Sequence, residues 1–569
     1  MAEQTTYTTQ PSRKGSKKTV LTVVLTILVG LIYFYFNLPA INLHAKEFYV
    51  FIFILCAVYI GLTLLFSGEK LQGGVREYLG FVKRRCLLPG ILVALLVVIF
   101  LVGTLLSSVI IRARSYHELL PVTTGDFAQD VDEISYDKIP MLDETSAEQL
   151  GKRKLGELSD MVSQFEISSS YTQINYQGRP VRVTYLRYGD FFKWFSNMRN
   201  GLPAYMLIDM TTQEVDVVRL PEGQGIKYSP SEYFFRNLNR HLRLKYPTFM
   251  FATPTFEIDE NGTPYWVCSK IEKTIGLFGG TDINGAVLVN AVTGESQYYE
   301  KEDVPTWVDR VYPSNLIIEQ YDYYGTYGNG FLNSLFGQKG VTVSTDGYNY
   351  IALNDDVYLY TGVTSVTSDQ SNIGFILSNQ RTKETKYYSS AGATEYSAMA
   401  SAEGVVQHLN YMATFPLLLN IDGQPTYFIA LKDNANLVKL YAMVNEQQYQ
   451  IVATGASVAA CESAYLDLMA QHGITDPSTR PPVESGLTVT GTIVDIRTAV
   501  IDGNSYYYFK LDSDDRYFSI SASSNQTAII LNKGDAVTLR ISAGTQDSSI
   551  VSILSLSLPQ PEPAEPKAE

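Results

Sequence analysis

The alternation of apolar and polar residues divides the chain into a short membrane part and a much larger polar part. Three uncharged apolar runs, at residues 20–36, 48–66 and 90–111, lie in the first fifth of the 569 residues, and no comparable run follows. Each run has about the 20 residues that a helix needs to cross the hydrocarbon core of a bilayer. The pattern therefore predicts three transmembrane helices within residues 19–114.

The positions of Lys and Arg predict the orientation of these helices, because short cytoplasmic loops retain positive charge. Residues 1–18 hold four basic residues and the loop between the second and third runs holds five, whereas residues 38–47 hold only Lys46. We expect residues 1–18 to form a cytoplasmic basic tail and the chain from about residue 115 onward to lie outside the cytoplasm. Arg112 and Arg114 oppose this orientation, unless they anchor the helix end among lipid headgroups.

The two parts differ in net charge. Residues 1–114 carry 12 Lys and Arg against 4 Asp and Glu, which gives +8, whereas the remaining residues carry 32 against 54, which gives −22. A nucleic-acid partner would need Lys and Arg against its phosphates, so the acidic part is not expected to bind one. Solubility alone is a sufficient explanation of the negative charge.

Cysteine is sparse in this sequence. Cys56 lies in the second apolar run and Cys86 just before the third, which leaves Cys268 and Cys461 in the polar part. Both of these lie in apolar contexts, so we expect buried free thiols, although the sequence leaves open whether they pair. A single pair is no disulfide scaffold, and the low number favours a bacterial surface over a eukaryotic one.

A hairpin pattern recurs within residues 115–475. Each copy has one strand, a turn with Gly178, Gly262 or Gly423, and a second strand rich in aromatic and β-branched residues. These glycines supply the positive φ that a tight hairpin turn needs, and a shorter relative is predicted at Gly347. Further strands end in a Thr-x-Glu turn, at residues 212–214, 293–295 and 382–384.

Helical patterns precede the hairpins. Ser229 and Glu232 form a predicted capping box, with Pro230 at the first helical position, and Gly473 closes the last helix. The repeating unit is predicted to be one helix followed by about three antiparallel strands, and the spacing of 84 residues between the first two hairpin glycines indicates duplication. The expected helices span residues 146–162, 233–245, 313–321, 397–410 and 457–472.

The repeated unit resembles PepSY-like domains, which are small helix-plus-antiparallel-sheet modules whose last strands carry a Val-x-Val-x-x-x-Thr-Gly-Glu-like turn. Residues 287–295 give the best match and end in Thr-Gly-Glu, whereas the other copies have Gln213 or Lys383 in place of the Gly. We interpret the Thr-x-Glu residues as serving the turn. The resemblance covers residues 145–455 in pieces, and it implies a noncatalytic module of cell-envelope or secreted proteins, in some cases one that inhibits or regulates peptidases.

The pattern changes after residue 475. A Pro-rich linker is predicted at residues 476–485, followed at residues 486–557 by about five strands, a hairpin at 502–504 and a short helical piece. This order looks like a small OB-like β-barrel, and the acidic balance favours a protein contact for it over nucleic acid. Residues 558–569 are mostly Pro, Glu, Ala and Lys, and we expect them to be disordered.

No catalytic or metal-binding motif is found in the sequence. The five His never pair at an i, i+4 spacing, and HExxH, CxxC, GxSxG and P-loop motifs are absent. Asp512, Asp514 and Asp515 lack the Gly and terminal Glu of an EF-hand loop, so a solvated turn is expected there. We therefore predict a protein that is not an enzyme, with no catalytic, cofactor-binding or metal-binding residues.

Two Gly-aromatic loops are the predicted recognition sites. Exposed apolar side chains on such loops could enter a membrane, hold a protein partner or clamp a glycan. The alternative is that these side chains fold back onto the protein's own sheet. The candidate residues are Leu277 and Phe278 in the first loop, and Phe331, Leu332, Leu335 and Phe336 in the second.

Small residues in the third apolar run suggest a packing contact. Gly103, Ser107 and Ser108 would let another helix approach closely. Scattered small residues are also ordinary in membrane helices, so both explanations stay open.

Together these patterns predict a membrane-anchored α+β protein with three N-terminal transmembrane helices, tandem PepSY-like units and a small C-terminal OB-like barrel. We expect a multi-pass protein of a bacterial plasma membrane that acts as an interaction or regulatory scaffold of the cell envelope, with a protein partner bound by its extracytoplasmic domain. One alternative is a hydrolase or transferase acting on wall polymers, which would need converging acid and base groups in a cleft. Another is an accessory subunit of a membrane transport complex. The absence of charged side chains inside the apolar runs disfavours a transporter or channel formed by the three helices themselves.

Overall fold

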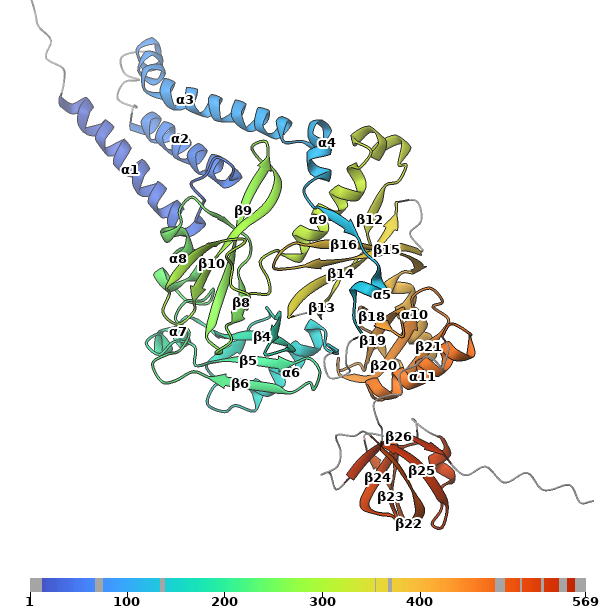
Figure 1. Ribbon diagram of the computed structural model, residues 1–569. Helices are drawn as coiled ribbons and strands as arrows, with labels where there is room; N and C mark the ends of the chain where they lie inside the picture. Colours follow the sequence, from blue (N-terminus) through green and yellow to red (C-terminus); the bar gives the residue numbers. More distant parts are fainter. Residues whose placement is uncertain are drawn as a thin grey trace, which may run out of the picture. The chain divides into compact units, whose positions relative to one another are not determined.

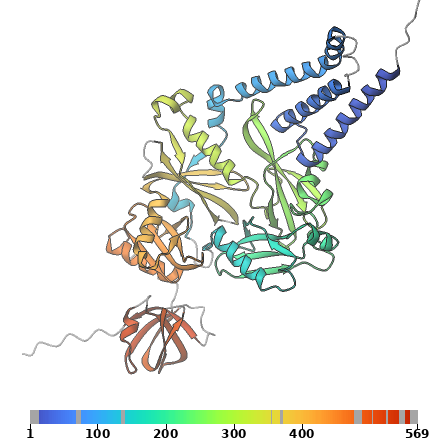
Figure 2. The same cartoon turned by 180° about the vertical axis from the view of Figure 1, so that it is seen from behind.

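The structure is a computed structural model that describes residues 13–66, 75–133, 139–353, 355–366, 371–475, 487–501, 504–522, 526–541 and 550–557. The predicted tail before residue 13, the linker at 476–485, the turn at 502–503 and the tail at 558–569 lie outside the described residues. The chain is a mixed α+β protein with two compact units (Figure 1 and Figure 2). The first unit holds Met1–Thr124, Ala147–Asp369 and Phe375–Tyr387, and the second holds Gly125–Ser146, Gln370–Gly374 and Tyr388–Glu569.

Three long apolar helices lie near the N-terminus. They are α1 (Arg13–Asn37), α2 (Lys46–Phe66) and α3 (Val75–Leu106). Each is long and apolar enough to cross a membrane, and few of their side chains are buried within the protein. Side chains that face lipid need no protein cover, so this exposure suits spanning helices. Three helices of membrane-spanning length and composition were predicted, and the structure has them.

The third helix differs from its predicted bounds. The apolar run extends to Ile111, but α3 ends at Leu106 and a separate helix, α4 (Val109–His117), follows. At the break, the Ser107 hydroxyl donates to the Gly103 carbonyl at 2.6 Å and the backbone of Ser108 is extended. The apolar run continues into α4, so composition alone did not reveal the break.

Four open sheets within the described residues share one plan, in which a helix precedes five strands. In each copy a long strand pairs along one edge with two short strands. Its other edge pairs with a fourth strand, and the fifth strand pairs with the far edge of the fourth. Two short strands share one long partner, which is why the sequence pattern predicted about three strands instead of five. We name the four copies repeat 1 to repeat 4.

The elements of the repeats follow in chain order. Before repeat 1 come β1 (Val122–Thr124) and α5 (Phe127–Asp130). Repeat 1 contains α6 (Glu144–Gly156), β2 (Phe165–Ile167), β3 (Thr172–Tyr176), β4 (Arg179–Tyr188), α7 (Phe191–Asn197), β5 (Ala204–Asp209) and β6 (Val215–Arg219). Repeat 2 contains η3 (Phe234–Arg236), α8 (Leu238–Lys245), β7 (Met250–Phe251), β8 (Thr255–Ile258), β9 (Pro264–Ile275), β10 (Gly279–Asn290) and β11 (Ser296–Glu300). Repeat 3 contains α9 (Ser314–Tyr327), η4 (Asn333–Gly337), β12 (Thr342–Ser344), β13 (Asn349–Leu353), β14 (Asp356–Ser365), β15 (Ser371–Asn379) and β16 (Thr385–Ala393). Repeat 4 contains α10 (Glu395–Val405), η5 (Gln407–Leu409), β17 (Met412–Ala413), β18 (Leu417–Ile421), β19 (Gln424–Lys432), β20 (Val438–Asn445) and β21 (Val452–Gly455), and α11 (Val458–Gln471) follows it.

The strand register is equivalent in all four copies. The start of each long strand (β4, β9, β14 and β19) pairs antiparallel with the strand just before it. The end of each long strand pairs with the other short strand. Repeat 3 has one addition: β1 joins β16 in parallel, so that Val122 pairs with Thr385.

The hairpin turns confirm three of the predicted glycine positions and correct one. Gly178, Gly262 and Gly423 have φ values of 75°, 77° and 73°. The prediction at Gly347 is wrong, because Gly347 lies between β12 and β13 and the hairpin turn of repeat 3 contains Asp355, with φ 72°. Asp tolerates this left-handed conformation better than most residues, so repeat 3 has the turn without the Gly that marks the other three.

A second turn recurs after β5, β10 and β15. The side chain at its first position accepts hydrogen bonds from the backbone N–H groups two and three residues on, and the Thr of each Thr-x-Glu accepts one from the N–H of its Glu. The interpretation that Thr-x-Glu serves the turn is therefore confirmed. The first positions are Asp209, Asn290 and Asn379, and the left-handed middle residues are Gln213 (φ 64°), Gly294 (φ 77°) and Lys383 (φ 66°).

The helices predicted for the repeats are present, although one of them starts later than expected, and α7 in repeat 1 was not predicted. The predicted capping box at Ser229 and Glu232 does not form, and α8 begins at Leu238 with the Asn237 side chain accepting from the backbone N–H of Arg240. The other helices lie where they were expected, with shifted ends: α6 and α10 are shorter and α9 is longer. The helix predicted at 457–472 is α11, whose N-cap is Ser457 and which Gly473 follows with φ 71°.

The last part of the second unit is a small β-barrel. Its strands are hydrogen-bonded in the closed order β22–β23–β24–β26–β25. Phe509 and Phe518 are fully buried in its core, with ring centroids 6.3 Å apart. The elements are β22 (Leu487–Ile501), β23 (Asn504–Leu511), β24 (Asp514–Ser521), η6 (Gln526–Ile530), β25 (Ala536–Ile541) and β26 (Ile550–Ser557).

Candidate membrane-proximal recognition surfaces

The tip of the β9–β10 hairpin contacts the apolar helices. The Ser107 hydroxyl oxygen accepts hydrogen bonds from the backbone N–H groups of Leu277, at 2.8 Å, and Phe278, at 3.0 Å. Phe278 is only 8% exposed, and its ring lies 5.4 Å from that of Tyr49 in α2 and 5.2 Å from that of Phe100 in α3. The hairpin tip is therefore part of the packing around α2 and α3 (Figure 1).

Small residues make this approach possible. A Cβ atom at Gly103 would lie 2.7 Å from the Leu277 side chain, and one at Gly276 would lie 2.5 Å from the Ser107 hydroxyl. The small face of the third apolar run thus contacts a hairpin of repeat 2, where the sequence suggested another helix. Leu277 and Phe278 were candidates for a recognition loop, with folding back onto the protein's own sheet as the alternative; in the structure they pack against the helices.

The second predicted loop begins as an ordered helix. Tyr323 and Tyr324 lie in α9, where the ring of Tyr323 packs on Tyr116 of α4 and the ring of Tyr324 stacks on His117, with centroids 4.8 Å and 4.7 Å apart. His117 Nδ1 lies 2.7 Å from the Tyr324 carbonyl oxygen. Repeat 3 is therefore connected to the segment that leaves α3.

The apolar residues beyond α9 form an exposed tip. Leu332 is 70% exposed, Leu335 55% and Phe336 83%. Leu335 and Phe336 lie on the short π-helical turn η4, and Leu332 directly precedes it. Phe331 is half-buried and stacks on Tyr327 at 6.5 Å. For the three exposed residues, which we call the η4 tip, the alternative of folding back onto the sheet does not apply.

Two Asn side chains brace the η4 tip. Asn333 Oδ1 accepts from the backbone N–H of Lys339 at 3.2 Å, and its Nδ2 donates to the Lys339 carbonyl at 3.0 Å. Asn329 Nδ2 donates to the same carbonyl at 2.9 Å. The turn is thus held by its own polar groups while its apolar side chains point outward.

A larger exposed aromatic surface was missed in the sequence analysis. We call it the α7–η3 surface, and its members come from two segments that are about 40 residues apart in the chain. Rings of Phe191 and Tyr233 lie 5.2 Å apart, and Trp194 lies 4.8 Å from Tyr233 and 5.7 Å from Phe234. The exposed members are Phe191, Phe192, Phe195, Tyr233, Phe234 and Phe235.

A buried carboxylate anchors the α7–η3 surface. Glu232 is 3% exposed, and its carboxylate accepts hydrogen bonds from Trp194 Nε1 at 2.7 Å and from the Tyr188 hydroxyl at 2.8 Å. Burial raises the pKa of Glu232, although both donors lower it. The signal in the sequence was two aromatic runs, at 191–195 and 233–235, but Glu232 in Ser-Pro-Ser-Glu looked like a helix start and hid the role of the second run.

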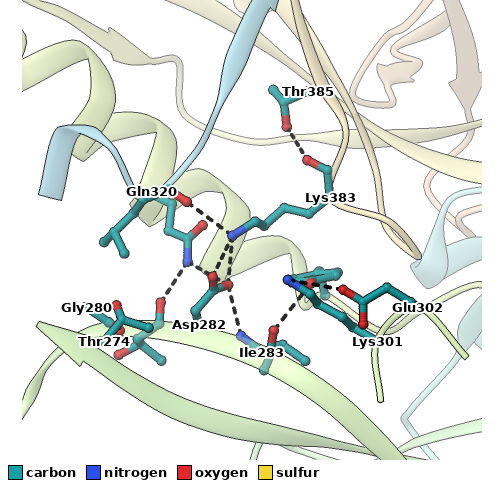
Figure 3. A network of polar contacts seen from close by, with 12 residues as sticks. Thr274, Gly280, Asp282, Ile283, Lys301, Glu302, Gln320, Lys383 and Thr385 are labelled. Carbon is teal, nitrogen blue, oxygen red and sulfur yellow. Dashed lines mark hydrogen bonds and ion pairs between the residues drawn. The ribbon is translucent and has the colours of Figure 1, made fainter. Parts of the chain in front are cut away.

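A polar network joins repeat 2 to repeat 3 (Figure 3). Lys383 Nζ donates to both carboxylate oxygens of Asp282, at 2.8 and 2.7 Å, and to the Leu119 carbonyl at 3.1 Å. Gln320 Nε2 donates to the Thr281 carbonyl at 2.7 Å and contacts Asp282 at 3.3 Å. Lys383 is the left-handed residue of its Thr-x-Glu turn, so this position, occupied by Gly in repeat 2, has an added role in repeat 3.

Two buried carboxyl groups lie where repeats 1 and 2 meet. Glu257 accepts from the backbone N–H of Asp309 at 3.0 Å, and Asp309 accepts from that of Asn175 at 2.6 Å. Burial raises the pKa of Glu257 to about 7. Burial, and then the charge of Glu257, raise the pKa of Asp309 well above its usual value. Their hydrogen-bond partners are backbone N–H groups and, for Glu257, also the Thr255 hydroxyl at 3.2 Å, all within the fold, which is typical of a structural role.

The remaining polar candidates are also used within the fold. Asp514 pairs with Arg516 at 2.6 Å and Asp515 with Lys510 at 2.8 Å. Among the described residues, no group of three or more His, Cys, Asp and Glu side chains could hold a metal ion. Cys268 and Cys461 are free and buried, as expected, and burial raises the pKa of the Cys461 thiol to about 12.

The comparisons with known proteins add little. No protein-family model matches the chain, and no curated protein matches it. Among solved structures, the crystal structure of an ACO/RPE65 chimera aligns with 68% of this chain and 64% of its own, at 9% identity and a TM-score of 0.12. The chain thus spans less than two thirds of that structure's chain, and so weak a similarity carries no argument about fold or function.

Proposed function

We propose that this chain is a noncatalytic, membrane-anchored scaffold of the bacterial cell envelope that binds a protein partner through its domain outside the membrane. The observation that carries the proposal is the η4 tip, where Leu332, Leu335 and Phe336 are exposed together on a braced turn. Apolar side chains that cluster in water on a rigid support are typical of contact sites, because a partner that covers them gains the free energy of their burial.

The repeats support the PepSY-like assignment. Each copy has a helix and an antiparallel sheet, and three copies carry the Thr-x-Glu turn at the same place after the fourth strand. The barrel supports the OB-like assignment, because its strands close in the order first, second, third, fifth, fourth, with a helical piece between the third and fourth. Both assignments favour binding over catalysis.

The charge asymmetry supports an extracytoplasmic position for the large domain. Residues 1–18 and the loop after α2 are basic, and short basic segments remain in the cytoplasm. Protease added to protoplasts should release fragments of about the size of the polar part. Protection in intact protoplasts, with digestion only after lysis, would reverse the orientation.

The partner proposal is tested with a triple variant of the η4 tip. Leu332→Ser, Leu335→Ser and Phe336→Ser replace side chains that have no cover, so thermal stability should stay unchanged while crosslinked partners recovered from intact membranes are lost. The matched control is Val405→Ser, Leu409→Ser and Met412→Ser, which changes three other exposed apolar residues. A large loss of stability in the η4 triple would mean that these residues are core, and unchanged crosslinking in a folded variant would remove the tip as the contact site.

A further inference from the structure

The α7–η3 surface is held at the end of a helix that can cross the membrane. Arg240 Nε donates to the Tyr35 carbonyl at 3.3 Å, and its Nη1 donates to the Phe234 carbonyl at 2.5 Å. The same guanidinium lies 4.1 Å above the Tyr35 ring. Tyr35 belongs to the last turn of α1, so one side chain connects the point where α1 leaves the apolar layer with the backbone of η3.

Further contacts join the end of α1 to α8 and to the residues that follow it. Arg243 Nε donates to the Leu38 carbonyl at 2.9 Å, and the backbone N–H of Ile41 donates to the Pro247 carbonyl at 2.8 Å. The ring of Phe235 packs edge-on against Tyr35, with centroids 6.3 Å apart. In both views α8 lies beside the end of α1 (Figure 1 and Figure 2). The η3 and α8 segments therefore lie beside the end of α1, at the level where a spanning helix would leave the bilayer.

The side chains of the α7–η3 surface have the chemistry of that boundary. Phe192 is 78% exposed, Phe195 61% and Phe235 66%. Aromatic rings are enriched at the headgroup level of membranes, where an apolar body and a polar edge can both be accommodated. Exposed in water, the same rings would cost free energy and favour aggregation.

The local charge favours a phospholipid as the occupant. Residues 233–256 contain four basic side chains and no Asp or Glu, although the polar part as a whole carries a net charge of −22. Basic groups beside apolar rings are attracted to anionic headgroups while the rings enter the acyl boundary. The basic side chains are Arg236, Arg240, Arg243 and Lys245.

The surface is also rigid. Glu232 holds Trp194 and Tyr188 from below, and Arg236 Nη1 donates to the Met198 carbonyl at 2.5 Å, which joins η3 to the end of α7. Phe234 has a φ of 50°, a left-handed conformation that is costly for a bulky residue. These contacts therefore hold η3 against α7 before any lipid is met.

We propose that the α7–η3 surface enters the headgroup layer of the bilayer that α1 crosses, with Phe192, Phe195 and Phe235 among the lipids and the positive charge of residues 236–245 near anionic phosphates. This contact fixes the tilt of repeats 1 and 2 over the membrane. The inference rests on α1 spanning the bilayer and is independent of the partner at the η4 tip, so either one can fail alone.

Fluorescence quenching by lipid tests the proposal in the full-length protein. The Phe192→Trp variant is reconstituted into phosphatidylcholine vesicles that contain phosphatidylglycerol, with and without bromine on the acyl chains. After subtraction of the wild-type signal, the added Trp fluorescence should be quenched by the brominated lipid and protected from aqueous iodide. Vesicles of phosphatidylcholine alone should give weaker quenching, because the anionic headgroups are missing.

The matched control is Asn261→Trp. Asn261 is exposed in the β8–β9 turn, at the far end of the 12-residue strand β9 from the tip that contacts α3, which is roughly 40 Å along the strand. This Trp should be quenched by iodide and not by the lipid. Equal lipid quenching in both variants, or free access of iodide to Phe192→Trp, overturns the proposal. Equal quenching in neutral and anionic vesicles overturns the role of the phosphates. If the thermal unfolding of Phe192→Trp departs from that of the wild type, Phe195→Trp is used in its place.

Discussion

Ser107 and Leu277 are 170 residues apart in the sequence, yet the Ser107 hydroxyl oxygen lies 2.8 Å from the Leu277 backbone nitrogen. The contact joins the break after α3 to the tip of the β9–β10 hairpin. Its donors are backbone groups in apolar surroundings, where an unmade hydrogen bond is expensive. Repeat 2 is therefore attached to the apolar helices by its main chain, and this contact restricts its motion relative to them.

The first prediction concerns this attachment. Gly103→Leu should displace the hairpin tip, because even a Cβ atom there would lie 2.7 Å from the Leu277 side chain. We expect amide hydrogen exchange at residues 276–280 to accelerate about tenfold or more, which corresponds to a loss of about 1–3 kcal/mol locally. Gly90→Leu is the control in the same helix, since a Cβ there meets no atom within 4 Å. Similar exchange in both variants would show that the tip is held by other contacts.

The second prediction concerns the left-handed residue of the Thr-x-Glu turns. Gln213→Gly should raise the free energy of unfolding by about 0.5–1 kcal/mol, because Gly relieves the cost of the positive φ at some cost in chain entropy. Gly294→Ala should do the opposite and lose more than 1 kcal/mol, because its Cβ would lie 2.3 Å from the Tyr228 ring. Thermal unfolding of the two variants and the wild type in the same detergent measures both changes in stability. A destabilised Gln213→Gly would mean that the Gln side chain is needed.

The third prediction is a dependence of stability on pH. Burial raises the pKa of Glu257 in the folded protein from its ordinary value of 4.5 to about 7, so the protonated form is favoured by folding. Its contribution is present below pH 4.5 and is lost as the pH rises through 7. Glu257→Gln removes this titration and keeps an oxygen to accept from Asp309. The variant should match the wild type near pH 4.5 and exceed it in melting temperature near pH 8. If the melting temperatures of the variant and the wild type changed with pH in parallel, burial would not be what raises the pKa of Glu257.

The fourth prediction concerns the contact between repeats 2 and 3. Lys383→Met leaves the partly buried Asp282 without its cation, and a loss of about 1–3 kcal/mol is expected. Adding Asp282→Asn to this variant should restore part of the loss, because the unpaired charge disappears. A double variant that is the sum of the two single ones would indicate that the residues do not interact.

The sequence was informative where one local pattern determines one local structure. Apolar runs predicted the three helices, and Gly178, Gly262 and Gly423 predicted the hairpin turns, because only the backbone conformation at that residue matters. The hairpin turn of repeat 3 was not predicted, because Asp355 adopts the same conformation without being Gly. Ser457 and Gly473 predicted both ends of α11 for the same local reason.

The contact surfaces were less predictable, because they depend on residues far apart in the chain. Glu232 looks like a capping residue until Trp194 and Tyr188 are known to donate to it. Phe278 and Phe336 lie in similar Gly-aromatic contexts, but one packs on α2 and α3 and the other is exposed. No periodicity distinguishes these cases, since burial is decided by what folds over the residue.

Strand β1 imposes an order on how this protein is made. Val122 follows the apolar helices and is synthesised early, but its partner Thr385 emerges some 260 residues later, a delay of roughly 10–50 s at ribosomal speed. The strands of repeats 1 and 2 find all their partners within their own segments and can close first. The sheet of repeat 3 cannot be completed until β16 is made, so a nascent chain that stalls before residue 385 would present an unfinished edge to chaperones and proteases.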